Sequence, residues 1–463
     1  MSAMNTLKKF GLEQAFNYVY KDPDKNFIKI MDWADKFSGG GFPTQRAMIR
    51  AAISNPEHPY YPFIHRLVTD IDPHVMKTLV ANFFINANLA GWKKQDECRE
   101  KYGCNIPWAI LLDPTSACNL HCTGCWAAEY GNKLNLTYDE IDDIIRQGKE
   151  LGVYMYIYTG GEPLVRKKDL IRLCEKHNDC IFLSFTNATL IDEDFANDML
   201  RVGNFVPAIS LEGFETATDG RRGNGVYQKV IKAINLLREK KLVFGISACY
   251  TSANFESITS EAFYDSLIDL GAYFIWYFHY MPVGNDAAPD LLPTKEQREY
   301  MYHRVREIRG ATGGKPIYAM DFQNDGEFVG GCIAGGRNYC HINANGDVEP
   351  CVFIHYSSAN IREVTLLEAL KQPLFMAYRD RQPFNSNHLR PCPMLENPEI
   401  LQEMIKETGA KSTDLQSPES AEHLCSKCKA YACEWKKTAD QLWKEHPHQQ
   451  KGYTNYKKRV EKQ

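Results

Sequence analysis

The strongest constraint on the fold is a regular alternation of short apolar runs with amphipathic segments between residues 106 and 320. Apolar runs of this length are typical of buried strands, and the segments between them have the periodicity of helices. Strands that alternate with helices form a parallel sheet with right-handed crossovers. The expected strands are residues 110–112, 154–158, 181–185, 206–211, 242–248 and 273–280, and the expected helices are residues 138–151, 168–177, 193–202 and 227–240.

This alternation predicts an α/β fold whose central domain, residues 106–320, is a partial, open parallel α/β barrel. Helical periodicity predicts a helical N-terminal module over residues 1–105, interrupted by the glycines at 39–41. Residues 321–440 contain seven of the fifteen cysteines, which predicts a small cysteine-rich domain stabilised by metal ligation. Residues 441–463 form a basic C-terminal tail.

Composition and charge exclude several classes of protein. The 463 residues are 44% hydrophobic and 24% charged, which is the balance of a folded chain. A formal net charge of -4 gives no overall attraction to nucleic acid. The apolar stretches at 78–92 and 270–285 are shorter than the roughly 20 residues that cross a bilayer, so we expect no transmembrane helix.

The fifteen cysteines have to be explained in a chain whose first 21 residues lack the apolar block of a secretory signal. This predicts a cytoplasmic protein, in which thiols stay reduced. An odd number of cysteines also argues against a fully paired disulfide framework. The cysteines are therefore expected to be buried apolar residues, nucleophiles or metal ligands.

Three cysteines, Cys118, Cys122 and Cys125, follow the first expected strand in one short loop. Three thiolates can hold three corners of a [4Fe-4S] cluster, which leaves one iron open to an external ligand. Ligands of parallel α/β folds bind at the carboxyl ends of strands, where this loop lies. The alternative is a zinc knuckle, but structural zinc takes four protein ligands and no fourth one follows at the usual spacing.

With these cysteines the chain resembles the radical S-adenosylmethionine (SAM) enzymes. Thr159-Gly160-Gly161-Glu162-Pro163 is similar to the family's glycine-rich segment, Thr186-Asn187-Ala188 to its Thr-Asn-Gly, and Ser210-Leu211-Glu212-Gly213 with Asp219-Gly220-Arg221-Arg222-Gly223 to its Ser-x-Asp-Gly and Asp-x-x-Arg-Gly elements. Ala188 and Glu212 depart from the pattern, and so does Gly124, where the family commonly has an aromatic residue. Trp126 is a candidate to shield the cluster instead.

The resemblance implies a SAM site made of Gly160, Gly161, Glu162, Pro163, Asn187, Ser210 and Arg222. In this site Glu162 or backbone carbonyls accept from the SAM ammonium group, and Arg222 pairs with the SAM carboxylate. A solvated surface ion pair is the alternative for Arg222. A reductant such as flavodoxin or ferredoxin would supply the electron that cleaves SAM to methionine and a 5′-deoxyadenosyl radical.

A second group of cysteines resembles a SPASM domain, the auxiliary-cluster module of many radical SAM enzymes. The resemblance implies at least one auxiliary [4Fe-4S] cluster, and its candidate ligands are Cys332, Cys351, Cys392, Cys425, Cys428 and Cys433, with Cys340 as a seventh cysteine nearby. Cys433 departs from the usual spacing, and Cys392 is a candidate for the missing position. A zinc site made from Cys332, Cys351, Cys425 and Cys428 is the alternative. The remaining cysteines are interpreted as ordinary thiols, at positions Cys98, Cys104, Cys174, Cys180 and Cys249.

Asp321, at the last expected strand, is a candidate general base, with a surface or capping role as the alternative.

The leading functional hypothesis is hydrogen abstraction from a peptide or protein side chain, and the first alternative is a small metabolite or lipid. A different class, an iron-sulfur electron carrier or a zinc-braced binding protein, is the second alternative. The apolar segment 79–92 is either buried core or an interfacial helix on a membrane.

Overall fold

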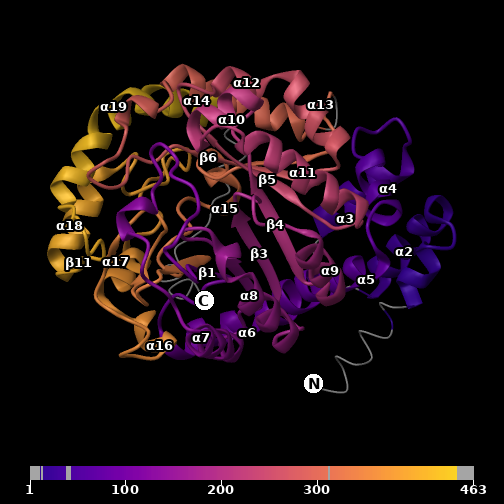
Figure 1. Ribbon diagram of the computed structural model, residues 1–463, viewed down its shortest axis with the longest axis horizontal. Helices are drawn as coiled ribbons and strands as arrows, with labels where there is room; N and C mark the ends of the chain where they lie inside the picture. Colours follow the sequence, from indigo (N-terminus) through magenta and orange to yellow (C-terminus); the bar gives the residue numbers. More distant parts are fainter. Residues whose placement is uncertain (1–10, 12–13, 38–42, 311–312, 446–463) are drawn as a thin grey trace.

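The computed structural model describes residues 11, 14–37, 43–310 and 313–445, and its centre is one sheet of nine strands (Figure 1). Their spatial order is β7-β6-β5-β4-β3-β2-β1-β8-β9. All neighbours pair in parallel except β9, which is antiparallel to β8. The predicted α/β fold with an open parallel sheet is confirmed. The strands are β1 (Ala109–Leu112), β2 (Met155–Tyr158), β3 (Ile181–Thr186), β4 (Phe205–Ser210), β5 (Gly245–Tyr250), β6 (Phe274–His279), β7 (Tyr318–Asp321), β8 (Tyr339–Ile342) and β9 (Val348–Glu349).

Crossover helices connect the parallel strands, as the periodicity predicts. In α7, for example, Thr137 and Glu140 form a capping box, and Ile141, Ile144 and Ile145 turn a fully buried face to the sheet. The crossover helices are α7 (Tyr138–Glu150), α8 (Lys167–Lys176), α9 (Glu193–Val202), α11 (Val226–Glu239), α13 (Glu261–Leu270) and α14 (Lys295–Ile308), with the short helices α10 (Glu215–Arg222) and α12 (Phe255–Thr259) between them.

The sheet is curved, as contacts between side chains of distant strands on one of its faces show. The ring centroids of Phe185 on β3 and Phe278 on β6 are 5.4 Å apart, although two strands lie between β3 and β6. Tyr277, the neighbour of Phe278, points to the opposite face and donates to the carbonyl of Ile258 in α12. This alternation separates an aromatic concave face from a face covered by helices.

The C-terminal region is more regular than the sequence indicates. β8 joins the main sheet beside β1, and a hairpin turn at Asn345-Gly346 connects β8 to β9. The 25-residue helix α19 (Ala421–Glu445) contains both Cys425 and Cys428. Its buried residues recur at helical spacing, a pattern that the sequence analysis did not use because it considered these cysteines only as candidate metal ligands. The other elements are α15 (Gly326–Val329), α16 (Leu366–Ala369), α17 (Pro373–Arg381), α18 (Pro398–Thr408) and the two-stranded ribbon of β10 (Tyr356–Ser357) and β11 (Lys411–Ser412).

The N-terminal region is helical, as predicted, and in Figure 1 it lies on the side of the sheet away from α18 and α19. Its helices are α2 (Pro23–Phe37), α3 (Pro43–Ser54), α4 (Tyr61–Thr69), α5 (Pro73–Val80), the π-helix η1 (Ala81–Gly91) and α6 (Trp92–Tyr102). The glycines at 39–41 and residues 446–463 of the predicted tail lie outside the described residues, whereas residues 441–445, also predicted as tail, belong to α19.

The apolar segment 79–92 is partly core and partly surface. The amide of Asn82 donates to the carbonyl oxygens of Asn178 and Cys180, which docks η1 against the loop before β3. Phe84 and Trp92, by contrast, are 49% and 43% exposed. Among the described helices, none is both long enough and apolar enough to cross a membrane.

A fully buried ion triad joins β8 to the end of β1. His341 Nε2 lies 2.9 Å from Asp113, and His341 Nδ1 lies 2.7 Å from Glu349. Burial opposes the charge of the imidazole, but the two carboxylates raise the pKa of His341 to about 10. The histidine therefore stays protonated at neutral pH and connects the two halves of the sheet.

The triad predicts that alkaline pH destabilises the protein. Because the folded pKa of His341 lies above the unfolded value of 6.5, its contribution to the free energy of unfolding is complete below pH 6.5 and is lost as the pH rises toward 10. We expect the urea midpoint to fall across this window. His341→Gln should remove that dependence and cost about 3 kcal/mol at pH 6.5, because it leaves buried carboxylates unpaired. The control is exposed His303→Gln, and an unchanged alkaline slope in His341→Gln would contradict the assignment.

Candidate iron-sulfur and SAM site

The three cysteines of the first motif lie in the loop after β1, at the carboxyl edge of the sheet. Cys118 is exposed, and Cys122 and Cys125 are partly exposed. The backbone N–H of Leu120 donates to Cys118 Sγ at 3.4 Å. Although Cys118 as a whole residue is exposed, the protein atoms around its sulfur partly desolvate it and raise its pKa to about 11, and the neighbouring thiols add to this. Thiolates that share one loop and accept backbone hydrogen bonds suit an iron-sulfur cluster.

Gly160 and Gly161 pack directly against the chain that leads into Cys118. Gly160 has a φ of 98°, and a Cβ there would lie 2.8 Å from the Asp113 side chain. A Cβ on Gly161 would lie 2.3 Å from the carbonyl oxygen of Ala117, far inside contact distance. The N–H of Glu162 donates to the same carbonyl at 2.9 Å. Only glycine permits this approach.

Glu162 holds the ends of β2 and β3 together. Its carboxylate is 1% exposed and accepts from Thr186 Oγ1 at 2.7 Å, from the N–H of Asn187 at 2.8 Å and from the N–H of Leu164 at 2.9 Å. Burial raises the pKa of Glu162, and these hydrogen bonds oppose the rise. Pro163, which is buried, begins the short helix after the motif.

Asn187 connects β3 to the cysteine loop, since its amide donates to Asn119 Oδ1 at 2.9 Å. Ala188, a departure from the family pattern, has a φ of 60°, so this position does require the left-handed conformation that glycine adopts most easily. Ser210 ends β4 and is partly exposed on the same edge of the sheet.

Arg222 is held by Glu212. Arg222 Nε donates to Glu212 Oε1 at 2.9 Å, and Arg221 Nη1 donates to the same oxygen at 2.7 Å. Burial opposes the charge of Glu212, but both guanidinium groups lower its pKa. Arg222 Nη1 also lies 3.8 Å from Cys122 Sγ. The arginine is thus buried beside the cysteine loop rather than solvated, and the longer glutamate reaches both arginines.

The sequence analysis missed Tyr280, which packs on the cysteine loop. Gly124 has a φ of 65°, and a Cβ there would meet the Tyr280 ring at 2.7 Å. The ring of Tyr280, which follows β6, therefore covers Gly124, where the chain has no side chain of its own. Trp126 points elsewhere, and its ring contacts Tyr130, His341, Phe353 and His355. Cys249, interpreted as an ordinary thiol, is partly exposed as a residue, and desolvation of its sulfur raises its pKa to about 11, while the nearby positive charge of Arg221 opposes the rise.

The concave face carries a row of aromatic rings. Trp276 and Phe278 are partly exposed there, whereas Tyr277 between them is fully buried. Phe278 contacts Phe185 and Phe322, with centroid distances of 5.4 Å in both pairs. From the sequence alone, these residues can be identified only as apolar. Side chains alternate between the two faces of a strand, and the sequence does not show which alternate set of β6 residues points to the concave face.

The second group of cysteines gathers around two buried tyrosines. Tyr339 donates to Cys351 Sγ at 2.8 Å, and Tyr339 and Tyr378 both have pKa values raised by burial and by neighbouring cysteines. Those cysteines are Cys332, Cys351 and Cys392 for both tyrosines, and Cys425 in addition for Tyr378.

The remaining candidate ligands lie on α19, where Cys428 is buried beside Cys425 and Cys433 is exposed. Within the described part of the chain, no three His, Cys, Asp or Glu side chains converge closely enough to hold a metal ion. The irons of a cubane cluster occupy separate corners, so its ligands need not converge on one point.

Asp321 is fully buried at the end of β7. Its Oδ1 accepts from the N–H groups of Gln323 and Asn324, which is a capping arrangement, and Tyr250 donates to the same oxygen at 3.5 Å. Burial and the nearby Asp325 raise the pKa of Asp321 to about 6. Asp321 therefore caps the turn that follows β7 and is not a surface residue, and its role as a general base stays a prediction.

A buried chain of contacts leads from Asp321 to Cys392. Asn324 donates to Asp321 and accepts from Arg298 Nε at 2.9 Å. Arg298 Nη2 pairs with Glu396 at 2.7 Å, and both side chains are fully buried. The other oxygen of Glu396 accepts from the N–H of Cys392 at 2.7 Å.

A curved parallel sheet with a three-cysteine loop at its carboxyl edge defines an α/β protein built to hold an iron-sulfur cofactor. Comparison with known proteins identifies the family. The radical SAM superfamily profile matches residues 112–256, and the profile of an iron-sulfur cluster-binding domain, SPASM, matches residues 332–393. The chain therefore contains a radical SAM domain and a C-terminal SPASM domain, and its relatives with these domains are enzymes. The two domains imply SAM, a [4Fe-4S] cluster and an auxiliary cluster as cofactors.

Several curated relatives resemble the chain. An AdoMet-dependent heme synthase of Methanosarcina barkeri is 26% identical over 286 residues, which cover 56% of this chain and 80% of the relative. A PqqA peptide cyclase of Bradyrhizobium diazoefficiens is 26% identical over 278 residues, covering 56% and 70%. Among solved structures, SuiB of Streptococcus suis bound to S-adenosylmethionine has a TM-score of 0.55 at 21% identity, over 71% of this chain and 80% of SuiB. The similarity to SuiB supports the fold of this chain and nothing about its activity.

The contact of Gly161 with Ala117 generates a prediction. Gly161→Ala should displace the cysteine loop and lower the iron and sulfide content of the reconstituted first cluster at least tenfold, because the new Cβ overlaps a backbone oxygen that cannot move alone. Iron analysis and electron paramagnetic resonance measure this. Gly220→Ala is the matched control, since nothing lies within 4 Å of its added Cβ. Full cluster loading in Gly161→Ala would refute the role of this contact.

Proposed function

We propose that the chain abstracts hydrogen from an apolar or aromatic side chain of a peptide or protein, bound against the aromatic row of Phe185, Trp276, Phe278 and Phe322. The observation that carries this proposal is the partial exposure of Trp276 and Phe278 on the concave face, where Phe278 packs against Phe322. Aromatic rings bind flat apolar groups through dispersion and the exclusion of water. They also keep water away from a reactive radical.

In this proposal Cys118, Cys122 and Cys125 hold the SAM cluster. When bound and reduced, the cluster supplies the electron that cleaves SAM to a 5′-deoxyadenosyl radical. Gly160 and Gly161 leave room beside the cysteine loop, Glu162 and Asn187 orient it, and Arg222 lies beside Cys122 to pair with the SAM carboxylate. Ser210 and Pro163 complete the site.

The auxiliary cluster is assigned to Cys332, Cys351 and Cys392, with Cys425 and Cys428 from α19. Backbone N–H groups of Met394 and Leu395 donate to Cys392 Sγ at 3.4 Å, as in iron-sulfur ligand loops. Cys433 is exposed, so among the predicted ligands of the auxiliary cluster it has the least structural support. Asp321 would take up a proton when substrate is oxidised, and flavodoxin or ferredoxin would deliver electrons.

A small planar metabolite is the second candidate substrate. The heme synthase of M. barkeri favours it, since a tetrapyrrole is also a flat, largely apolar ligand for an aromatic surface. A substrate that carries deuterium at its reactive carbon separates the two classes. Transfer of deuterium into 5′-deoxyadenosine from a labelled peptide supports the first class, and transfer from a labelled porphyrin supports the second.

Replacing Cys118, Cys122 and Cys125 by alanine should abolish 5′-deoxyadenosine formation in dithionite-reduced protein. The auxiliary iron should remain, because its ligands lie in another part of the chain. Product analysis by mass spectrometry and iron counting measure the two effects. Equal loss of iron from both groups of cysteines would contradict two separate cluster sites.

Trp276→Ala should lower substrate-dependent deuterium transfer at least tenfold while SAM cleavage without substrate persists, because the aromatic row contacts substrate rather than the cluster. Tyr277→Phe is the matched control, since Tyr277 points to the helices on the other face. If Tyr277→Phe reduces transfer as much as Trp276→Ala, the aromatic row is not the substrate surface.

A further inference from the structure

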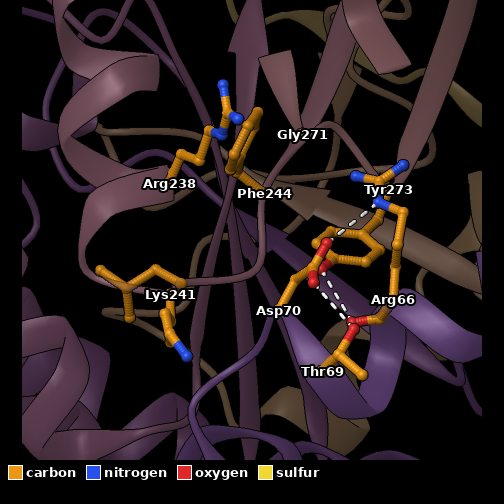
Figure 2. A pocket seen from close by; sticks show the side chains of 9 residues that line it. Arg66, Thr69, Asp70, Arg238, Lys241, Phe244, Gly271 and Tyr273 are labelled. Carbon is orange, nitrogen blue, oxygen red and sulfur yellow. Dashed lines mark hydrogen bonds and ion pairs between the residues drawn. The ribbon is translucent and has the colours of Figure 1, made fainter. Parts of the chain in front are cut away.

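A pocket of about 280 Å³ lies at the edge of the sheet opposite the cysteine loops, where β5 and β6 begin (Figure 2). α4 contributes Arg66 and Thr69 to it, and α11 contributes Arg238. The rest of the lining comes from Asp70, Lys241, Leu242, Phe244, Gly271 and Tyr273. We call this the Arg66–Arg238 pocket. The proposed radical chemistry uses none of its residues.

The charges of the pocket are unbalanced. Three positive side chains, those of Arg66, Arg238 and Lys241, share one carboxylate. That carboxylate, Asp70, lies 3.4 Å from Arg66 Nε and accepts from Thr69 Oγ1 at 2.8 Å. Arg66 Nη1 is buried and has no hydrogen-bond partner among the described residues. Donors and positive charge are thus left for a ligand.

The two arginines approach the same point from different elements. A Cβ built on Gly271 would lie 3.7 Å from Arg238 Cδ and 3.9 Å from Arg66 Nη2. Arg66 also lies over the Tyr273 ring, 5.0 Å from its centroid, and Figure 2 shows Arg238 beside the ring of Phe244. Each guanidinium group thus lies beside a different aromatic ring of the same pocket, and an anion bound in the pocket would be attracted by both positive charges.

A purely structural role for these arginines is stabilisation of helix ends. Both lie in the last turns of their helices, where positive charge is favourable. However, the terminal carbonyls of Arg66 and Arg238 already accept from the N–H groups of Asp70 and Lys241. Helix stabilisation also gives no reason for two arginines of separate helices to meet at one glycine.

We propose that the Arg66–Arg238 pocket binds the phosphate group of an organic phosphate. Guanidinium groups match the oxygens of phosphate in geometry and charge, and the aromatic walls leave space for an attached organic part. The phosphate comes either from a soluble phosphate ester or from a phospholipid headgroup. Because α4 belongs to the N-terminal region and α11 to the α/β region, bound phosphate connects the two.

Isothermal titration of the full-length, cluster-loaded protein tests this proposal in a phosphate-free buffer of constant ionic strength. One arm uses glycerol 3-phosphate, and the other uses sedimentation with phosphatidylcholine vesicles that do or do not contain phosphatidic acid. We expect saturable binding in one arm, which identifies the source of the phosphate. Arg238→Gln should weaken it at least tenfold, the loss expected for one charge-assisted hydrogen bond.

Lys232→Gln is the matched control, because Lys232 is an exposed cation on α11 outside the pocket. Arg238 is exposed as well, so Arg238→Gln should fold normally, and Arg66→Gln provides a second variant from the other helix. The proposal is overturned by the absence of saturable binding in both arms. It is also overturned if Lys232→Gln weakens binding as much as Arg238→Gln, which would reveal a nonspecific response to charge.

Discussion

The close approach of the Gly160-Gly161 backbone to residues 113–117 is the constraint on which the cysteine site depends. This contact sets where the loop of Cys118 begins, and Glu162 then extends the arrangement to β3 through Thr186 and Asn187. Arg221 and Arg222 bring in the end of β4 through Glu212. Four neighbouring strands therefore position one loop, and buried hydrogen-bonded carboxylates rather than apolar contacts do most of the positioning.

The second cysteine group is connected to the barrel in a similar way. Arg298 on α14 contacts Asn324, near the end of β7, and Glu396, which supports the backbone of Cys392. A fully buried arginine is stable only when its charge and its donors are matched, so this connection is sensitive to any change in its partners. Asp321 lies at one end of the connection, and the loop of Cys392 lies at the other.

Much of the fold and of the first site could be predicted from the sequence, because both depend on local pattern. Strand and helix periodicity indicated the parallel sheet, and the spacing of Cys118, Cys122 and Cys125 indicated the cofactor. The rest depends on contacts between distant segments. Tyr280 over Gly124, the inward parity of Trp276, and the meeting of Cys392 with Cys351 follow from sheet curvature and loop packing, which leave no local signal. The helix α19 was not predicted, because the sequence analysis considered its cysteines only as candidate metal ligands.

The position of β8 beside β1 has a consequence for biosynthesis. β1 is made early, yet its partner on one side, β8, begins at Tyr339, more than two hundred residues later. Until that segment leaves the ribosome, β1 presents an unpaired edge that can pair with another nascent chain. Delayed closure of this kind slows folding, since a long loop must be ordered before the pairing is gained. A protein truncated before Tyr339 would keep the three-cysteine loop and yet be prone to aggregate.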